Sequence, residues 1–83
     1  MNSMERTYRI SRIPKKQKRR HNLLRNLVLL FEPGREYTEK EVNQVLQEVY
    51  HDYAELRRCL IDDGFLDRLP DGSRYWVKQL SVD

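Results

Sequence analysis

The sequence predicts a small α+β domain in which three helices are followed by a β-hairpin. Two observations support this fold class. Capping signals begin two consecutive short helical segments, and an Asp-Gly turn lies between two apolar runs near the C-terminus. A longer helical pattern precedes both segments. This is the chain order of a winged helix-turn-helix domain, a fold used mostly to bind nucleic acid and sometimes only to contact proteins.

The first helix is expected over residues 15–31. Its apolar residues fall in two rows at helical spacing: Leu24, Leu27, Val28 and Phe31, then Leu23, Leu27 and Leu30. Two rows predict a helix that is buried over much of its circumference. Leu29 lies on the polar side, where it is a hint of a contact surface. Pro33 and Gly34 then end the helix in a turn.

The second helix is expected over residues 39–50. Thr38 and Glu41 have the spacing of a capping box, in which each side chain accepts a hydrogen bond from the amide group of the other residue. Tyr37 and Val42 flank this box and fit a hydrophobic staple. The apolar residues of the segment form a single stripe at helical spacing: Val42, Val45, Leu46, Val49 and Tyr50. We therefore expect one buried face and one polar face.

The third helix is expected over residues 52–63, with Asp52 as its N-cap and Gly64 as the positive-φ residue that ends it. Strands of about residues 65–69 and 74–78 follow, on either side of the Asp71-Gly72 turn. A hairpin this short needs packing to hold, so we expect its aromatic residues to cover one core shared with the helices. The residues concerned are Trp76, Tyr75 or both, over a single core that contains Leu24, Leu56 and Phe65.

Eighty-three residues allow one domain at most. We expect residues 1–13 to form an N-terminal arm, either a tail or a short edge strand from Tyr8 to Ile13, and residues 14–83 to form the domain. A core of this size is marginal, which together with the exposed position of Leu29 favours a homodimer over a monomer.

Cysteine content and hydropathy indicate a cytoplasmic protein. Cys59 is the single cysteine, so the chain forms no intrachain disulfide, as fits a reducing compartment. The longest apolar run, residues 27–31, contains five residues and is too short for a membrane span or a signal-peptide core. We expect a soluble protein with no membrane partner.

Catalysis has little support in the sequence. His21 and His51 lie thirty positions apart, and no glycine-rich phosphate loop or metal-ligand cluster is present. Asp62 and Asp63 are adjacent, and neighbouring residues on a helix diverge by about 100°. They fit solvated acids near a helix end better than a catalytic pair. We expect no enzymatic activity, no cofactor and no metal.

Basic residues are concentrated in the first part of the chain. Residues 1–31 contain nine basic residues and one acidic residue, whereas residues 32–83 contain seven basic and twelve acidic residues. Five cations fall within six positions at the start of the first helix, where the helix dipole disfavours them: Lys15, Lys16, Lys18, Arg19 and Arg20. We infer that something outside the helix offsets this cost. Nucleic acid and an acidic protein surface, including that of a second copy, both meet the requirement.

The last helix of a winged helix enters the major groove, and the hairpin contacts the DNA backbone. The candidate contacts there are Tyr53, Arg57, Arg58 and Arg74. Residues 52–63 nevertheless carry four acids and two arginines, a balance that repels phosphate. Arg58 also lies three residues from Glu55 and four from Asp62, a spacing that fits an ion pair on the helix surface equally well.

Several segments resemble a bacterial family of domains of unknown function, and the resemblance spans about residues 13–78. The segments are FEPGREYTEKEVN at 31–43, HDYAELRR at 51–58, GFLDR at 64–68 and DGSRYW at 71–76. In that family the domain occurs alone or behind a helix-turn-helix domain of transcriptional regulators. The resemblance implies a winged-helix-like fold in a regulatory setting, with no established biochemical activity and no known ligand.

The leading hypothesis is a small winged-helix-like module of bacterial gene regulation that binds nucleic acid weakly, with Arg57, Arg58 and the basic arm contacting phosphates. The alternative is an interaction or dimerisation module with no nucleic-acid role. A continuous positive surface joining residues 15–20 to Arg57 and Arg74 favours the first. Ion pairs that occupy the arginines of an acidic last helix favour the second.

Overall fold

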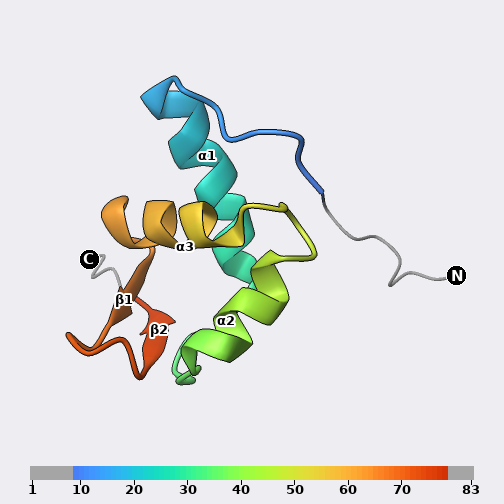
Figure 1. Ribbon diagram of the computed structural model, residues 1–83. Helices are drawn as coiled ribbons and strands as arrows, with labels where there is room; N and C mark the ends of the chain where they lie inside the picture. Colours follow the sequence, from blue (N-terminus) through green and yellow to red (C-terminus); the bar gives the residue numbers. More distant parts are fainter. Residues whose placement is uncertain (1–8, 79–83) are drawn as a thin grey trace, which may run out of the picture.

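The computed structural model describes residues 9–78 and has the predicted order of three helices and a hairpin. The elements are α1 (Gln17–Leu27), the 3-10 turn η2 (Val28–Leu30), α2 (Glu39–Leu46), α3 (Tyr53–Asp62), β1 (Leu66–Arg68) and β2 (Tyr75–Val77). Figure 1 shows α3 across the middle of the molecule, with the start of α1 on one side of it and the hairpin on the other. The winged-helix-like α+β fold is therefore confirmed.

The two apolar rows of the first helix are buried as predicted, except at Leu30. Leu24 and Leu27 are fully buried and Phe31 nearly so, while Leu23 and Val28 are partly buried against the core. Leu29 is 76% exposed, in agreement with its predicted place on the polar side, whereas Leu30 is 49% exposed although its row predicts burial. Leu30 lies in η2, and a 3-10 turn has three residues per turn, which shifts the angular position of its side chains relative to α1.

Both predicted caps are present. The Thr38 hydroxyl accepts from the Glu41 amide at 3.1 Å, and the Glu41 carboxylate accepts from the Thr38 amide at 2.9 Å, which completes the capping box of α2. The Asp52 carboxylate accepts from the Glu55 amide at 3.2 Å at the start of α3. Gly64 ends α3 with a φ of 82°, a conformation that glycine adopts without strain.

The hairpin pairs antiparallel, with Asp67 opposite Trp76. Tyr37, in the connection before α2, joins it through two hydrogen bonds of 2.8 Å with the backbone of Tyr75. The Tyr37 hydroxyl also accepts from the Glu32 amide at 2.7 Å. This bridge between distant segments was not predicted from the sequence. It attaches the hairpin to the helical part of the domain.

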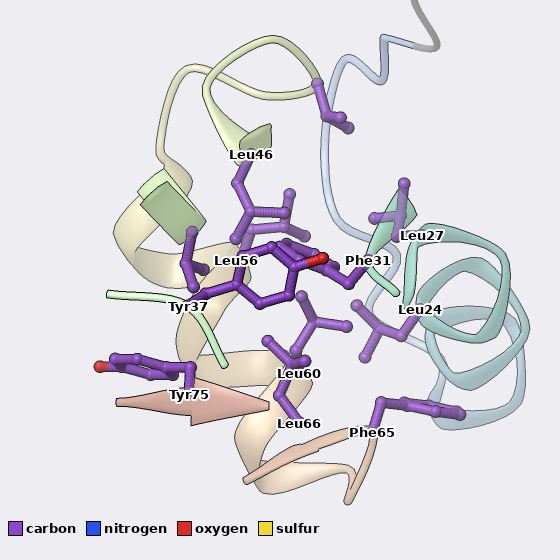
Figure 2. Packing of buried hydrophobic residues seen from close by; sticks show 12 residues of the cluster. Leu24, Leu27, Phe31, Tyr37, Leu46, Leu56, Leu60, Phe65, Leu66 and Tyr75 are labelled. Atoms are coloured by element: carbon purple, nitrogen blue, oxygen red, sulfur yellow. The ribbon is translucent and has the colours of Figure 1, made fainter. Parts of the chain in front are cut away.

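One hydrophobic core unites the helices and the hairpin, as predicted. Leu24, Leu56 and Phe65 belong to the same cluster, and Tyr75 is buried at its edge while Trp76 is half-exposed. Figure 2 shows the side chains of all these elements converging on a common interior. The domain is thus held together without any buried polar or charged residue among those described.

The segment before α1 lies against the domain. Ile10 and Ile13 pack on the core, and the Ile10 amide donates to the Val49 carbonyl at 2.9 Å. Residues 9–14 form no strand, and Tyr8, where the expected edge strand began, lies outside the described residues. Within residues 9–78, no helix has both the length and the apolar character needed to cross a bilayer.

Candidate functional site

Arg57, the first predicted contact of α3, is engaged inside the fold. Its guanidinium donates to the Asn43 side chain and lies 3.5 Å from the Glu39 carboxylate, both on α2. Only 19% of the Arg57 side chain is exposed. The Tyr75 hydroxyl lies 3.5 Å from the same Glu39 carboxylate. Arg57 therefore joins α3 to the first half of α2, and a base contact would require breaking these interactions.

Arg58 is exposed but paired along its own helix. Its Nη1 lies 3.0 Å from Oε1 of Glu55, one turn earlier. The exposed residues of α3 are Glu55, Arg58 and Asp62, two acids and one base. Tyr53 is half-buried and packs against the core. The helix that enters the groove in a DNA-binding winged helix presents no positive surface here.

Arg20 and Arg74 also have acidic neighbours. The Arg20 Nε and the His21 Nδ1 lie 3.8 and 3.6 Å from Oδ2 of Asp63, which ties the start of α1 to the end of α3. That Oδ2 atom is buried and accepts no hydrogen bond within the described part of the chain. On the hairpin, the Arg74 Nε lies 3.6 Å from Oε1 of Glu36.

The remaining predicted contacts behave differently. Lys15, Lys16, Lys18 and Arg19 are exposed, and none forms an ion pair with an acidic group of residues 9–78. This part of the chain offers no acid nearby in sequence, since residues 9–31 contain eight basic residues and no acidic one. Arg20, Arg57, Arg58 and Arg74 thus lie beside acids, whereas these four cations form no ion pair within residues 9–78.

Three of these cations line one cleft. Together with Arg12, which the sequence-based contact set did not include, Lys15, Lys16 and Arg19 surround a cavity of about 410 Å³. Ile13 and Pro14 complete its wall, and none of the described residues that line it is acidic. We call Arg12, Lys15, Lys16 and Arg19 the cationic cleft.

The cationic cleft lies at the N-terminal end of α1. Lys16 is the N-cap residue but provides no side-chain cap, and the first turn contains no acidic side chain. The first amide groups of an α-helix have no intrahelical acceptor, and the helix dipole is positive there. Cations at this end lower the stability of the free domain. The same arrangement favours a bound phosphate, because its oxygens accept hydrogen bonds both from the cationic side chains and from the free amide groups of the helix.

The chain matches the model of a protein family over residues 9–77, well over half of its length. The family is DUF2087, described as an uncharacterised protein conserved in bacteria. The chain belongs to this family. No curated protein and no solved structure matches it.

A second cleft in this DUF2087 domain lies between the arm and α3. It has a volume of about 570 Å³, with Arg12, Lys15 and Arg20 facing three acids. Cys59 lines it as well, and burial, followed by the charge of Glu55, raises the pKa of the Cys59 thiol. A thiol with a raised pKa remains protonated near neutral pH and is a poor nucleophile. Arg12 and Lys15 line both clefts, and within residues 9–78 one ion pair joins charges of this second cleft, between Arg20 and Asp63.

No group of three His, Cys, Asp or Glu side chains within residues 9–78 is arranged to hold a metal ion. The donors of the cationic cleft are ammonium and guanidinium groups, which bind anions and repel metal ions. The chemistry that the arrangement offers is therefore anion binding.

Proposed function

We propose that this DUF2087 domain is a winged-helix-like module of bacterial gene regulation that contacts nucleic acid weakly, through phosphates bound at the cationic cleft. One observation carries the proposal. Arg12, Lys15, Lys16 and Arg19 line one cleft that has no acidic lining residue within residues 9–78, whereas the arginines of α3 are paired with acids. Counterion release from phosphate contacts is the sequence-independent part of nucleic-acid binding.

In the proposed function α3 does not read base edges, unlike the last helix of a typical DNA-binding winged helix. Arg57 holds α3 to α2, and Arg58 is paired with Glu55, so neither is available for a guanine edge. Contacts limited to phosphates position a protein on nucleic acid without reading its sequence. We therefore expect weak binding with little preference among duplex sequences, and no enzymatic step.

The salt dependence of binding tests the proposal. If all four cations of the cleft contact phosphates, log affinity should fall with log salt with a slope of about −3.6, from about −0.9 per contact. Affinity for a random duplex should then drop about a hundredfold between about 50 and 200 mM salt. Fluorescence anisotropy of a labelled duplex measures both quantities.

Arg58→Gln is the matched control for that measurement. It removes one exposed arginine of α3 and its pairing with Glu55 while leaving the cleft intact. The salt slope and the affinity should stay near those of the unchanged protein. An absence of duplex affinity even at low salt, where phosphate attraction is strongest, would contradict the proposal.

The ion pairs of α3 also favour a second candidate function, an interaction module with no nucleic-acid role. A surface of Glu55, Arg58 and Asp62 carries both signs of charge and suits a protein partner better than a polyanion. Under this alternative the cationic cleft binds an acidic protein surface. The same anisotropy titration separates the two functions, because this one predicts no duplex affinity at any salt concentration.

A further inference from the structure

The second cleft, of about 570 Å³, has a lining of mixed chemistry. Its volume lies in the range of small-ligand sites. Arg12 and Lys15 contribute cations from the segment before α1, and the lining acids come from α3 and its C-cap residue Asp63. Ile13, Pro14 and Tyr50 add apolar and aromatic surface. A ligand that matches this lining has an anionic group, an apolar body and hydrogen-bond donors.

The acids of this cleft have acceptor capacity left. Glu55 is paired with Arg58, and Asp62 is exposed and also borders a cleft beside the hairpin. Asp63 is the clearest case, because its Oδ2 is buried and accepts no hydrogen bond within residues 9–78. A buried polar atom without a partner lowers the stability of the fold. An ionised carboxylate only accepts hydrogen bonds, so a ligand with N–H groups supplies the missing donors.

The cations connect this cleft to the proposed phosphate site. Arg12 and Lys15 line both clefts, and neither forms an ion pair within residues 9–78. The segment before them is anchored, since the Ile10 amide donates to the Val49 carbonyl at 2.9 Å. A phosphate bound by Arg12 and Lys15 therefore lies next to the second cleft as well as in the cationic cleft.

We infer that the second cleft receives an unpaired base of the strand whose phosphate the cationic cleft holds. The inference rests on the proposed function and extends it to single strands. An unpaired nucleotide combines a phosphate with a ring that has an apolar face and N–H donors on its edge. Guanine suits the acids best, because its edge presents adjacent N–H groups to the two oxygens of a carboxylate, whereas thymine presents one.

A duplex cannot make this second contact. Its bases are stacked and their donors are already paired, so a base enters a protein cleft only after it leaves the duplex. The cationic cleft then binds duplex phosphates without sequence preference, as proposed above. A single strand makes the same phosphate contacts and adds the base.

Cys59 reports on the occupancy of the cleft in the unchanged protein. It lines the cleft and is the single cysteine of the chain. Iodoacetamide modifies its thiolate at mildly alkaline pH, and mass spectrometry gives the rate. The probes are short single strands of equal length: one abasic throughout, one abasic except for a central guanine, and one abasic except for a central thymine. All three offer the same phosphates, so they differ only in the base.

The guanine strand should bind about tenfold more tightly than the abasic strand, within the effect of one stacked base. At about ten times its Kd, about a tenth of the molecules remain unoccupied, so modification of Cys59 should slow about tenfold. The abasic strand and a duplex should bind and leave Cys59 reactive. Asp63→Asn should reduce the preference for guanine over thymine, because the amide offers one acceptor where the carboxylate offers two. Circular dichroism checks that this variant is folded.

The outcomes separate this inference from the proposed function. If all three strands bind equally and leave Cys59 equally reactive, the inference is overturned and the phosphate contacts stand. Equal protection by the abasic and guanine strands also overturns it, because the second cleft then binds phosphate alone. If neither the strands nor a duplex bind even at low salt, the proposed function fails and the inference fails with it.

Discussion

Replacing Leu60 by alanine is expected to destabilise the domain by about 2–5 kcal/mol, the range measured for fully buried leucines. Leu60 lies in α3, is fully buried, and belongs to the core shared by the helices and the hairpin. The loss combines the transfer free energy of the deleted carbons with the cavity that remains. Small domains are stable by only a few kcal/mol, so a loss of this size should unfold a large fraction of the molecules.

Urea denaturation followed by circular dichroism measures this loss. Leu69→Ala is a suitable control, because it deletes the same atoms from a side chain that is 39% exposed, on the hairpin. We expect it to lower the free energy of unfolding by no more than about 1 kcal/mol. If both variants lowered the free energy of unfolding equally, that result would contradict a single core shared by α3 and the other elements.

Reversing three cations of the cleft should remove duplex binding. The triple variant Lys15→Glu, Lys16→Glu and Arg19→Glu replaces phosphate attraction with repulsion at the start of α1. Loss of three contacts alone reduces the salt slope by about 2.7. Affinity at low salt should fall at least about a hundredfold, because the new carboxylates also repel the duplex. Anisotropy titration measures the fall.

A variant with the same net charge separates the cleft from a general charge effect. Reversing Arg35, Lys40 and Lys78, which are exposed and lie outside the cleft, changes the net charge from +3 to −3 by the same three substitutions to glutamate. Long-range repulsion is then equal in the two variants, but the local contacts survive only in the second. If both variants lose affinity alike, the cationic cleft is not the binding site.

The triple variant should also be the more stable fold. Glutamate at the start of α1 complements the helix dipole, which the native lysines and arginine oppose. Greater stability together with lost binding would show that these cations are present for function at the expense of the fold.

Features set by a few neighbouring residues were predictable from the sequence. The capping box of Thr38 and Glu41 and the end of α3 at Gly64 depend on spacings of one to three residues, and both are present. The pairing of Arg58 with Glu55 follows the same kind of local rule. These signals explain why the order of elements was correct before any tertiary contact was known.

Features that depend on tertiary packing were not predictable. The bridge between Tyr37 and Tyr75 joins segments that no local spacing relates. Arg57 is occupied because α2 and α3 pack so that Glu39 and Asn43 lie beside it. The cluster of cations was visible in the sequence, but its shape as a cleft was not. Only the fold brings Arg12 to the same cleft as Arg19, with no acid among the described lining residues.

Amide chemical shifts recorded during titration with a short duplex test the central claim most directly, because they locate the contact residue by residue. Binding at the cationic cleft predicts that the perturbed amides are those of about residues 12–20, at the start of α1. The amides around Arg57 and Arg58 in α3 and around Arg74 in the hairpin should stay unchanged. Perturbations centred on α3 and the hairpin, with the start of α1 unaffected, would contradict the claim and restore α3 as the recognition helix.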